Sequence, residues 1–244
     1  MGVADILKRG AEELGIELDA RAIELFERYY RELAEWNRRM NLTSIEGEEE
    51  VAIKHFLDSL TCLLAVDLWG GCSVVDVGSG AGFPGVVLKV ARPEIRLTLV
   101  EASRKKAEFL RKLASVLEIE DVEVLWDRAE RVGQTTGYRE AFDVATARGV
   151  ADMAALVEVC LPLVKVGGVF VAMKGPDVGE EIAGAMDAVE VVGGRVARLV
   201  SVALPSGYGG RTLSVINKER RTPGRYPRRP GIPGKRPIRG PGGL

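Results

Sequence analysis

The sequence predicts an α/β protein: a largely parallel sheet with helices on both faces, preceded by a helical N-terminal region. Three observations support this. From Ser73 to about residue 190, short apolar segments alternate with helical ones, a pattern typical of a parallel sheet. Two longer apolar segments at 195–204 and 211–217 follow, and the short Pro- and Gly-rich stretch between them predicts a closing antiparallel pair. Before residue 65 the apolar residues recur at helical spacing.

The N-terminal region, residues 1–65, is predicted to be a helical extension. Between Arg21 and Met40, apolar side chains recur every three or four residues and form one stripe. The residues at 41–44 interrupt this pattern. Three glutamates at 48–50 then suit the positive end of a helix that runs to about Leu64.

Residues 66–217 are predicted to form the main α/β domain. Its first five strands are expected at 73–77, 96–101, 122–126, 142–147 and 168–174, and its helices at 84–91, 103–117, 151–161 and 177–190. Ligands in such sheets bind at the carboxyl ends of the strands. The residues that follow each strand are therefore the candidates for a functional site.

Residues 218–244 differ in composition from the rest of the chain. They hold nine Lys or Arg and one acid, a net charge of +8, which leaves −9 on the first 217 residues. Frequent Pro and Gly disfavour a helix or an inner strand, so we expect an extended, flexible basic arm. Such an arm on an acidic body favours a polyanionic partner, and a solvated tail without function is the alternative.

Composition excludes several classes of function. No apolar run approaches the roughly 18 residues of a membrane span, and the N-terminus does not resemble a signal peptide. The cysteines, Cys62, Cys72 and Cys160, lack metal-ligand spacing, and His55 is the only histidine, so we expect no metal site. We expect a cytoplasmic protein without a membrane partner.

The stretch from Val74 to Gly85 is the most informative part of the sequence. A buried strand ends at Asp76, and glycines at 78, 80 and 82 precede a helix. Glycine lets the backbone approach a ligand closely, and a helix N-terminus favours a negatively charged group. The loop is therefore expected to hold a small molecule that carries an anionic group.

Two cofactors suit such a loop. Residues 80–85 match the dinucleotide fingerprint G-x-G-x-x-G, but that fingerprint should open directly after the strand, where Gly78 already stands. S-adenosylmethionine (SAM) fits better, since Asp76-x-Gly78-x-Gly80-x-Gly82 resembles the first motif of SAM-dependent methyltransferases. Glu101, at the end of the next strand, stands where those enzymes keep the acid that binds the ribose. A glycine turn that only packs a helix on a strand is the third possibility.

Further strand ends suggest where the rest of the cofactor and the substrate lie. Residues 127–130 follow the third strand, where SAM enzymes usually contact adenine, although Glu130 could also be an exposed acid. Residues 146–149 follow the fourth strand and lack the Pro-Pro-aromatic motif of amine methylation. Cys160 is predicted within an apolar helix, away from a nucleophile position, and no carboxylate cluster suggests metal-assisted O-methylation. A substrate that is already a nucleophile remains, and guanine N7 fits because its lone pair needs no general base.

A resemblance extends over essentially the whole chain. Its motifs include Trp36 to Thr43, His55 to Leu60, Asp76 to Gly85, Arg128 to Glu130, Phe142 to Arg148, and Tyr226 to Pro237. In these the chain resembles the bacterial 16S ribosomal RNA guanine-N7 methyltransferases of the G type, also known as glucose-inhibited division protein B. The resemblance implies a Rossmann-like, seven-stranded SAM-dependent methyltransferase sheet. It also implies a cytoplasmic enzyme whose partner is 16S ribosomal RNA or the small ribosomal subunit, and we expect a monomer.

The resemblance also implies roles for individual residues. With Gly80 and Glu101 added from the motif itself, the predicted SAM-binding residues are Gly78, Gly80, Phe83, Glu101, Ala129, Glu130 and Arg148. The basic arm, His55 and Lys174 would face RNA, and His55, Arg148 and Lys174 are candidates for positioning the reactants. No residue is predicted to act as a catalytic base.

Alternatives remain open for these residues and for the function. His55 could be a buried structural histidine, and Arg148 could form a structural salt bridge. An arginine on the base would oppose the positive charge that methylation brings to guanine, so we expect Arg148 to hold a carboxylate or a phosphate and Lys174 a phosphate. The alternative functions are a SAM-dependent methyltransferase of a small molecule or a protein, a nicotinamide-dependent oxidoreductase, and an RNA-binding protein without catalysis.

Overall fold

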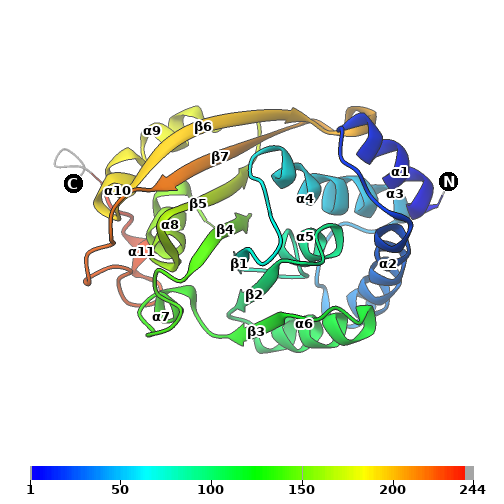
Figure 1. Ribbon diagram of the computed structural model, residues 1–244, viewed down its shortest axis with the longest axis horizontal. Coiled ribbons are helices and arrows are strands. Elements are labelled where there is room, and N and C mark those ends of the chain that lie inside the picture. Colours follow the sequence, from blue (N-terminus) through cyan, green and yellow to red (C-terminus); the bar gives the residue numbers. More distant parts are fainter. Residues whose placement is uncertain (1, 150, 240–244) are drawn as a thin grey trace.

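The fold is built around one seven-stranded mixed sheet with the strand order β3-β2-β1-β4-β5-β7-β6 (Figure 1). A computed structural model describes residues 2–149 and 151–239. The strands are β1 (Ser73–Val77), β2 (Arg96–Glu101), β3 (Val122–Trp126), β4 (Phe142–Arg148), β5 (Val164–Lys174), β6 (Gly194–Ala203) and β7 (Gly210–Lys218). All neighbours pair in parallel except β7, which is antiparallel to both β5 and β6. The predicted α/β fold with a closing antiparallel pair is confirmed.

The strand order reverses between β1 and β4, which places the ligand crevice. From β1 the chain adds β2 and β3 on one side, then returns to add β4 and β5 on the other. Crossovers leave the sheet in opposite directions at such a point, so a crevice opens at the carboxyl ends of these two strands. The residues after Val77 and Arg148 therefore lie on either side of it.

Helices cover both faces of the sheet (Figure 1). Those on one face are α1 (Val3–Glu13), α2 (Ala20–Met40), α3 (Glu48–Val51), the π-helical turn η1 (Ala52–Leu57), α4 (Asp58–Leu60), the 3₁₀ turn η2 (Thr61–Leu64), α5 (Gly85–Ala91) and α6 (Arg104–Leu117). Those on the other face are α7 (Ala129–Val132), α8 (Met153–Cys160), the 3₁₀ turn η3 (Leu161–Leu163), α9 (Gly179–Ala183), α10 (Met186–Val191) and α11 (Ile232–Lys235). A further 3₁₀ turn, η4 (Pro205–Gly207), joins β6 to β7. The helix predicted at 177–190 is thus two short helices.

The N-terminal extension shares its hydrophobic core with the sheet. The apolar stripe of α2 includes Phe26, Tyr29 and Leu33, each at most 2% exposed, and they belong to the same buried cluster as Val87 of α5 and Leu99 of β2. The apolar periodicity that predicts the helix therefore also identifies its buried face. Residues 1–65 are built into the sheet domain.

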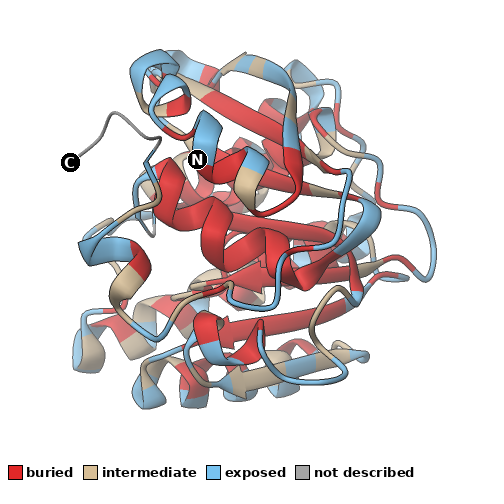
Figure 2. Ribbon diagram, turned by 90° about the vertical axis from the view of Figure 1, so that its left-hand side faces the viewer, coloured by how far each residue is buried: buried red, intermediate tan, exposed pale blue. Residues whose placement is uncertain are grey.

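Helix α8 is apolar around its whole circumference, so other parts of the protein must bury each of its faces. All eight of its residues are buried, including the one acid, Glu158, at 0% exposure. The sheet covers one side, and the C-terminal residues, including α11, pack on another. Figure 2 faces this side of the molecule and shows buried residues at its centre with largely exposed segments around them.

The prediction of an extended, flexible arm at 218–244 is wrong for the described residues of that stretch. Residues 219–239, here called the C-terminal segment, pack on α7, α8 and β6. Pro and Gly do exclude long regular structure, but they do not exclude docking. Tyr226 and Ile238 add to the apolar cluster around α8, and Pro227 and Pro233 are buried.

None of the described helices combines the length and the apolar character that a membrane crossing requires.

Candidate cofactor and substrate site

The loop between β1 and α5 turns at three glycines. Gly78, Gly80 and Gly82 have φ of +71°, +57° and +99°, the left-handed region that glycine adopts without strain. At Gly82 there is also no room, because a Cβ would lie 2.4 Å from the Tyr29 hydroxyl oxygen and 2.9 Å from a methyl carbon of Val86. The glycine spacing in the sequence thus predicts a real turn, held in place by a residue of α2.

Asp76 holds the loop to its neighbours. Its carboxylate is fully buried, accepts a 2.9 Å hydrogen bond from the Thr146 hydroxyl of β4, and accepts another of 3.2 Å from the Gly85 amide. Burial raises the pKa of Asp76 to about 6, against the lowering effect of these hydrogen bonds. Asp76 therefore joins β1, β4 and α5 at the switch point of the sheet.

Glu101 is positioned at the end of β2 by two backbone amides. One carboxylate oxygen accepts a 2.9 Å hydrogen bond from Gly80, and the other accepts one of 2.7 Å from Ser103. Each oxygen keeps a second lone pair. The side chain is 7% exposed and lines a cavity, where a carboxylate can accept from the two hydroxyls of a ribose.

Phe83 is packed between aromatic side chains from the N-terminal extension. The His55 ring stacks on it with centroids 4.4 Å apart, and the Tyr29 ring stacks with centroids 5.5 Å apart. The Tyr29 hydroxyl also donates a hydrogen bond to the carbonyl of Ala81 in the loop. The N-terminal helices therefore fix the shape of the glycine loop.

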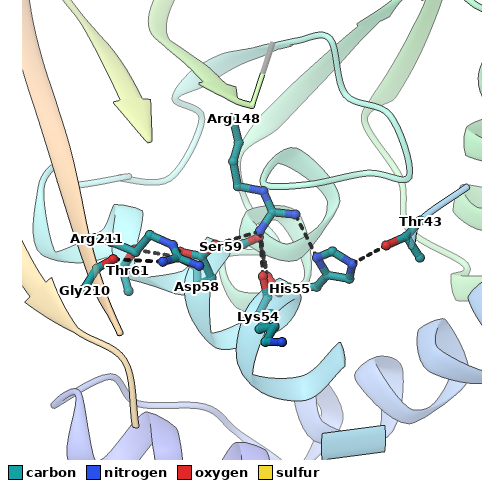
Figure 3. A network of polar contacts seen from close by, with 9 residues as sticks. All are labelled: Thr43, Lys54, His55, Asp58, Ser59, Thr61, Arg148, Gly210 and Arg211. Carbon is teal, nitrogen blue, oxygen red and sulfur yellow. Dashed lines mark hydrogen bonds and ion pairs between the residues drawn. The ribbon is translucent and has the colours of Figure 1, made fainter. Parts of the chain in front are cut away.

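Arg148 follows β4 and connects the sheet to the N-terminal extension (Figure 3). Its guanidinium donates to Asp58 Oδ2 and to the carbonyl of Lys54, both at 3.1 Å, and its carbon lies 4.9 Å from the Phe83 ring centroid. Arg211 of β7 approaches the other oxygen of Asp58 at 2.9 Å. Arg148 therefore forms the structural salt bridge that the sequence leaves open as an alternative, and its contact with SAM stays a prediction.

His55 is a neutral, fixed side chain. Arg148 lies 3.1 Å from its Nδ1, and since a guanidinium only donates, Nδ1 is the acceptor. The proton is then on Nε2, which donates to the Thr43 hydroxyl at 2.8 Å. Burial and the charge of Arg148 lower the pKa of His55 to about 3. With 7% of the residue exposed, we assign His55 a positioning role in place of the RNA contact that the resemblance implies.

Lys174 also differs from its expected role. Its ammonium donates 2.6 Å hydrogen bonds to Glu181 and to the carbonyl of Ala151, and its side chain is 12% exposed. The charge is thus neutralised within the protein, and Lys174 lines neither cavity of the site. A phosphate contact would have to displace Glu181.

Two adjoining cavities open at the carboxyl ends of the strands. The first, of about 400 Å³, is lined by Gly80, Phe83, Glu101 and Arg148 together with His55. The second, of about 220 Å³, has Ala129 and Glu130 in its wall. Both cavities share Gly78 and Ala102. The structure therefore brings all seven predicted SAM-binding residues to one continuous site.

The second cavity has a wall that the sequence did not predict. Three residues of the C-terminal segment line it: Gly231, Pro233 and Gly234. The Gly231 amide donates a 2.8 Å hydrogen bond to Glu130 Oε1. The composition of the Gly-Ile-Pro-Gly stretch predicts an RNA-facing arm, and the sequence patterns give no role to Tyr29 or Asp58. The motif around His55 contains Asp58 and was the available signal.

Other chemistries find no support in the described residues. Those ranges contain no group of three or more His, Cys, Asp or Glu that could hold a metal ion. Burial in α8 raises the pKa of the Cys160 thiol well above its usual value, so it is not a nucleophile for carbon methylation.

The geometry fits SAM. A carboxylate at the end of β2 suits the ribose, the missing side chains at Gly78 and Gly80 let a ligand approach the loop closely, and Glu130 suits the adenine amino group. The two-part cavity has room for the nucleoside at one end and the amino acid at the other. A pyrophosphate, as in a dinucleotide, would require Gly80 to direct its amide to the ligand, and Glu101 already occupies that amide.

Comparison with known proteins points to a family of methyltransferases, in agreement with the SAM site described above. The profile of the family described as "GidB: rRNA small subunit methyltransferase G" matches residues 22–206. Among curated relatives, "Ribosomal RNA small subunit methyltransferase G" of Pelotomaculum thermopropionicum is 50% identical over 97% of this chain and 99% of its own. The protein of the same name from Roseiflexus sp. is 50% identical over 96% and 99%.

Solved structures support the fold at low sequence identity. A SAM-dependent methyltransferase from Aquifex aeolicus has a TM-score of 0.52 and 19% identity, over 72% of this chain and 96% of its own. A precorrin-6y C5,15-methyltransferase from Geobacter metallireducens has a TM-score of 0.51 and 16% identity, over 67% and 88%. Because full-length relatives share half of its residues and the family profile matches most of its length, the chain belongs to the GidB family, the rRNA small subunit methyltransferases G.

Proposed function

We propose that this protein transfers the methyl group of SAM to N7 of a guanine in 16S ribosomal RNA, with SAM held across the two adjoining cavities. The observation that carries the proposal is that the two cavities adjoin at Gly78 and Ala102, with Glu101 in the wall of the first and Glu130 in the wall of the second. The adenine lies beside Ala129 and Glu130. The methionine end lies beside Gly80 and Phe83.

Bound SAM supplies an activated methyl group on a sulfonium. The residues of this chain bind and orient it: Glu101 accepts from the ribose, and the glycines of the loop leave space for the amino acid end beside Gly80 and Phe83. Guanine enters from the open side of the first cavity, near Phe83 and Arg148. Arg148 donates to Asp58 and to a carbonyl of η1, so its guanidinium is held by protein acceptors and is not free to bind the base.

The state of His55 supports a mechanism without a general base. It is the only histidine, its pKa is far below neutrality, and its Nδ1 lone pair is occupied by Arg148. The carboxylate in the wall of the first cavity, that of Glu101, already accepts hydrogen bonds from two backbone amides. An acceptor whose lone pair is available without deprotonation, as in guanine N7, suits these surroundings.

The rim of the site has cations suited to RNA phosphates. Lys106 borders the first cavity and Arg128 the second, and neither forms an ion pair with any residue the structure describes. Arg229 and Lys235 of the C-terminal segment are exposed nearby and are likewise unpaired within the described ranges. We propose that these side chains contact the backbone of the RNA, and that the enzyme acts as a monomer in the cytoplasm.

The test is methyl transfer from radiolabelled SAM to 16S rRNA, both naked and in small ribosomal subunits, from cells that lack this enzyme. Label should enter 7-methylguanosine at one position, mapped by borohydride and aniline cleavage of the RNA. The Gly80→Val variant serves as the matched inactive control. Label in another nucleoside, or only in protein or small molecules, would contradict the proposal.

A further inference from the structure

The C-terminal segment is anchored to the protein by buried polar contacts. Arg228 donates three hydrogen bonds to Glu158, which is fully buried in α8. They come from the backbone amide of Arg228 at 2.9 Å, from its Nε at 2.8 Å and from its Nη2 at 2.6 Å. Removing either partner would leave an uncompensated buried charge. The segment is therefore held at Arg228, three residues before the wall of the second cavity.

Backbone carbonyls of the segment accept hydrogen bonds from side chains of the loop that follows α7. Arg139 donates to the carbonyls of Thr222 and Tyr226 at 2.8 Å, and Gln134 donates to that of Pro227 at 2.9 Å. These contacts come from the loop between β3 and β4, which also carries Ala129 and Glu130. The segment and the adenine end of the site are thus built as one unit.

The segment then reaches Glu130 itself. The Gly231 amide donates to Oε1 of Glu130, and Gly231 has φ of +81°, so the chain turns there and places Pro233 and Gly234 along the cavity. Glu130 is 9% exposed, and its other oxygen, Oε2, accepts no hydrogen bond from any described residue. Glu130 lines the cavity, so this oxygen is left to serve a ligand there.

We infer that the C-terminal segment is part of the cofactor site: residues 231–234 close the adenine end of the pocket, and the Gly231 amide positions Glu130 to accept from the adenine amino group. Gly231 is a positioning residue, since it acts through Glu130. The inference rests on the proposed function for the identity of the ligand, but it does not depend on the RNA that is methylated.

The experiment measures binding of S-adenosylhomocysteine and of its deaminated analogue S-inosylhomocysteine by calorimetry, without RNA. Truncation after Arg229 removes the wall and keeps Arg228 with its partner Glu158. Truncation after Arg239 is the matched control, because it keeps the whole described segment. We expect the shorter chain to bind S-adenosylhomocysteine about tenfold more weakly, the order expected for a lost charge-assisted hydrogen bond, while the control stays within twofold.

The analogue separates positioning from general structural loss. Hypoxanthine has no amino group to donate, so a positioned Glu130 should make the full chain prefer the adenosyl ligand, and the shorter truncation should reduce that preference. Equal weakening of both ligands, or affinity within twofold of the full chain, would overturn the inference. If the full chain binds neither ligand, the proposed cofactor fails instead.

Hydrogen–deuterium exchange on the full chain tests the same inference when the truncated protein does not fold. Saturating S-adenosylhomocysteine should slow exchange of the amides at 230–236 at least as much as it slows those of the glycine loop. Residues 179–189, in α9 and the first part of α10, are the reference and should not change. Unaltered exchange at 230–236 with a protected glycine loop would overturn the inference.

Discussion

Asp58 and Arg148 lie 90 residues apart in the chain and form a 3.1 Å ion pair that joins the N-terminal extension to the end of β4. The side chain of Asp58 is 4% exposed and that of Arg148 17% exposed. Arg211 approaches the same carboxylate. One acid thus holds two arginines, and one of them, Arg148, lines the first cavity.

The first prediction concerns this acid. Asp58→Asn should lower the free energy of unfolding by about 3 kcal/mol, since it leaves two partly buried guanidinium groups without their counter-charge. The exposed pair Glu35–Arg39 provides the control, and Glu35→Gln should change stability by about 0.5 kcal/mol or less. Urea denaturation of both variants measures this. Equal effects would show that the Asp58 cluster is not a structural link.

The second prediction uses the single histidine. The folded-state pKa of His55 is about 3, below its unfolded value of 6.5, so its contribution to stability is full above pH 6.5 and is lost as the pH falls toward 3. At pH 5.0 the free energy of unfolding of the wild-type protein should be about 2 kcal/mol lower because of His55, and the His55→Gln variant should not show that loss. The stability difference between the two proteins should therefore shrink by that amount from pH 7.5 to 5.0.

Comparing the two proteins removes other titrations from this measurement. The pKa of Asp76 is raised to about 6, so its contribution runs the opposite way between pH 4 and 6. It is present in both proteins and cancels in the difference. A difference that stays constant over this pH range would mean that His55 has the same pKa in the folded and unfolded states.

Local sequence patterns predicted the parts of the fold that local physics decides. The strands at 73–77, 96–101 and 122–126 have the expected bounds, because each apolar run is flanked by polar or glycine residues. The glycine spacing predicted the turn after β1, since few other residues adopt its backbone angles.

Contacts between distant residues could not be predicted in this way. Nothing in the sequence near Arg228 shows that its partner is Glu158, 70 residues earlier, and composition alone suggested a free arm. An acid within an otherwise apolar helix was the available signal, since such a group needs a partner when buried. Arg148 and Asp58 follow the same rule.

The third prediction tests the fit of α2 to the glycine loop. Gly82→Ala should destabilise the protein because its Cβ would lie 2.4 Å from the Tyr29 hydroxyl oxygen and because φ there is +99°. Tyr29→Phe alone should lose about 1 kcal/mol with its hydrogen bond to Ala81. The double variant should be less destabilised than the sum of the two, since the clash with the hydroxyl is gone while that with Val86 remains. Additive effects would contradict this account.

The fourth prediction concerns the pH dependence of the reaction. If guanine N7 is the acceptor and no residue is a base, the single-turnover rate at saturating RNA and SAM should vary less than threefold between pH 6.5 and 8.5. Arg148 occupies the lone pair of His55, so this ring adds no ionisation in that range. Rapid-quench measurement of methyl transfer gives the profile. A tenfold rise per pH unit would indicate an acceptor that must lose a proton.

The last prediction concerns the outward-facing charges of the C-terminal segment. Arg225, Arg229 and Lys235 are exposed and form no ion pair with any described residue, whereas Arg228 is committed to Glu158. Substitution is therefore a cleaner test than truncation after Asn217, which would leave Glu158 buried and unpaired. The triple change to Gln should weaken binding to 16S rRNA and flatten its salt dependence. For three lost phosphate contacts the log–log slope should drop by about 2, at roughly 0.7 each.

The control is the same change at Lys8, Arg9 and Arg21, exposed cations of α1 and α2 on the other side of the sheet (Figure 1). Its slope should stay within about 0.5 of the wild-type value, because none of its cations faces the site. Equal drops in both variants would mean that the attraction is a general effect of charge, and no drop in either would remove the C-terminal segment from the RNA interface.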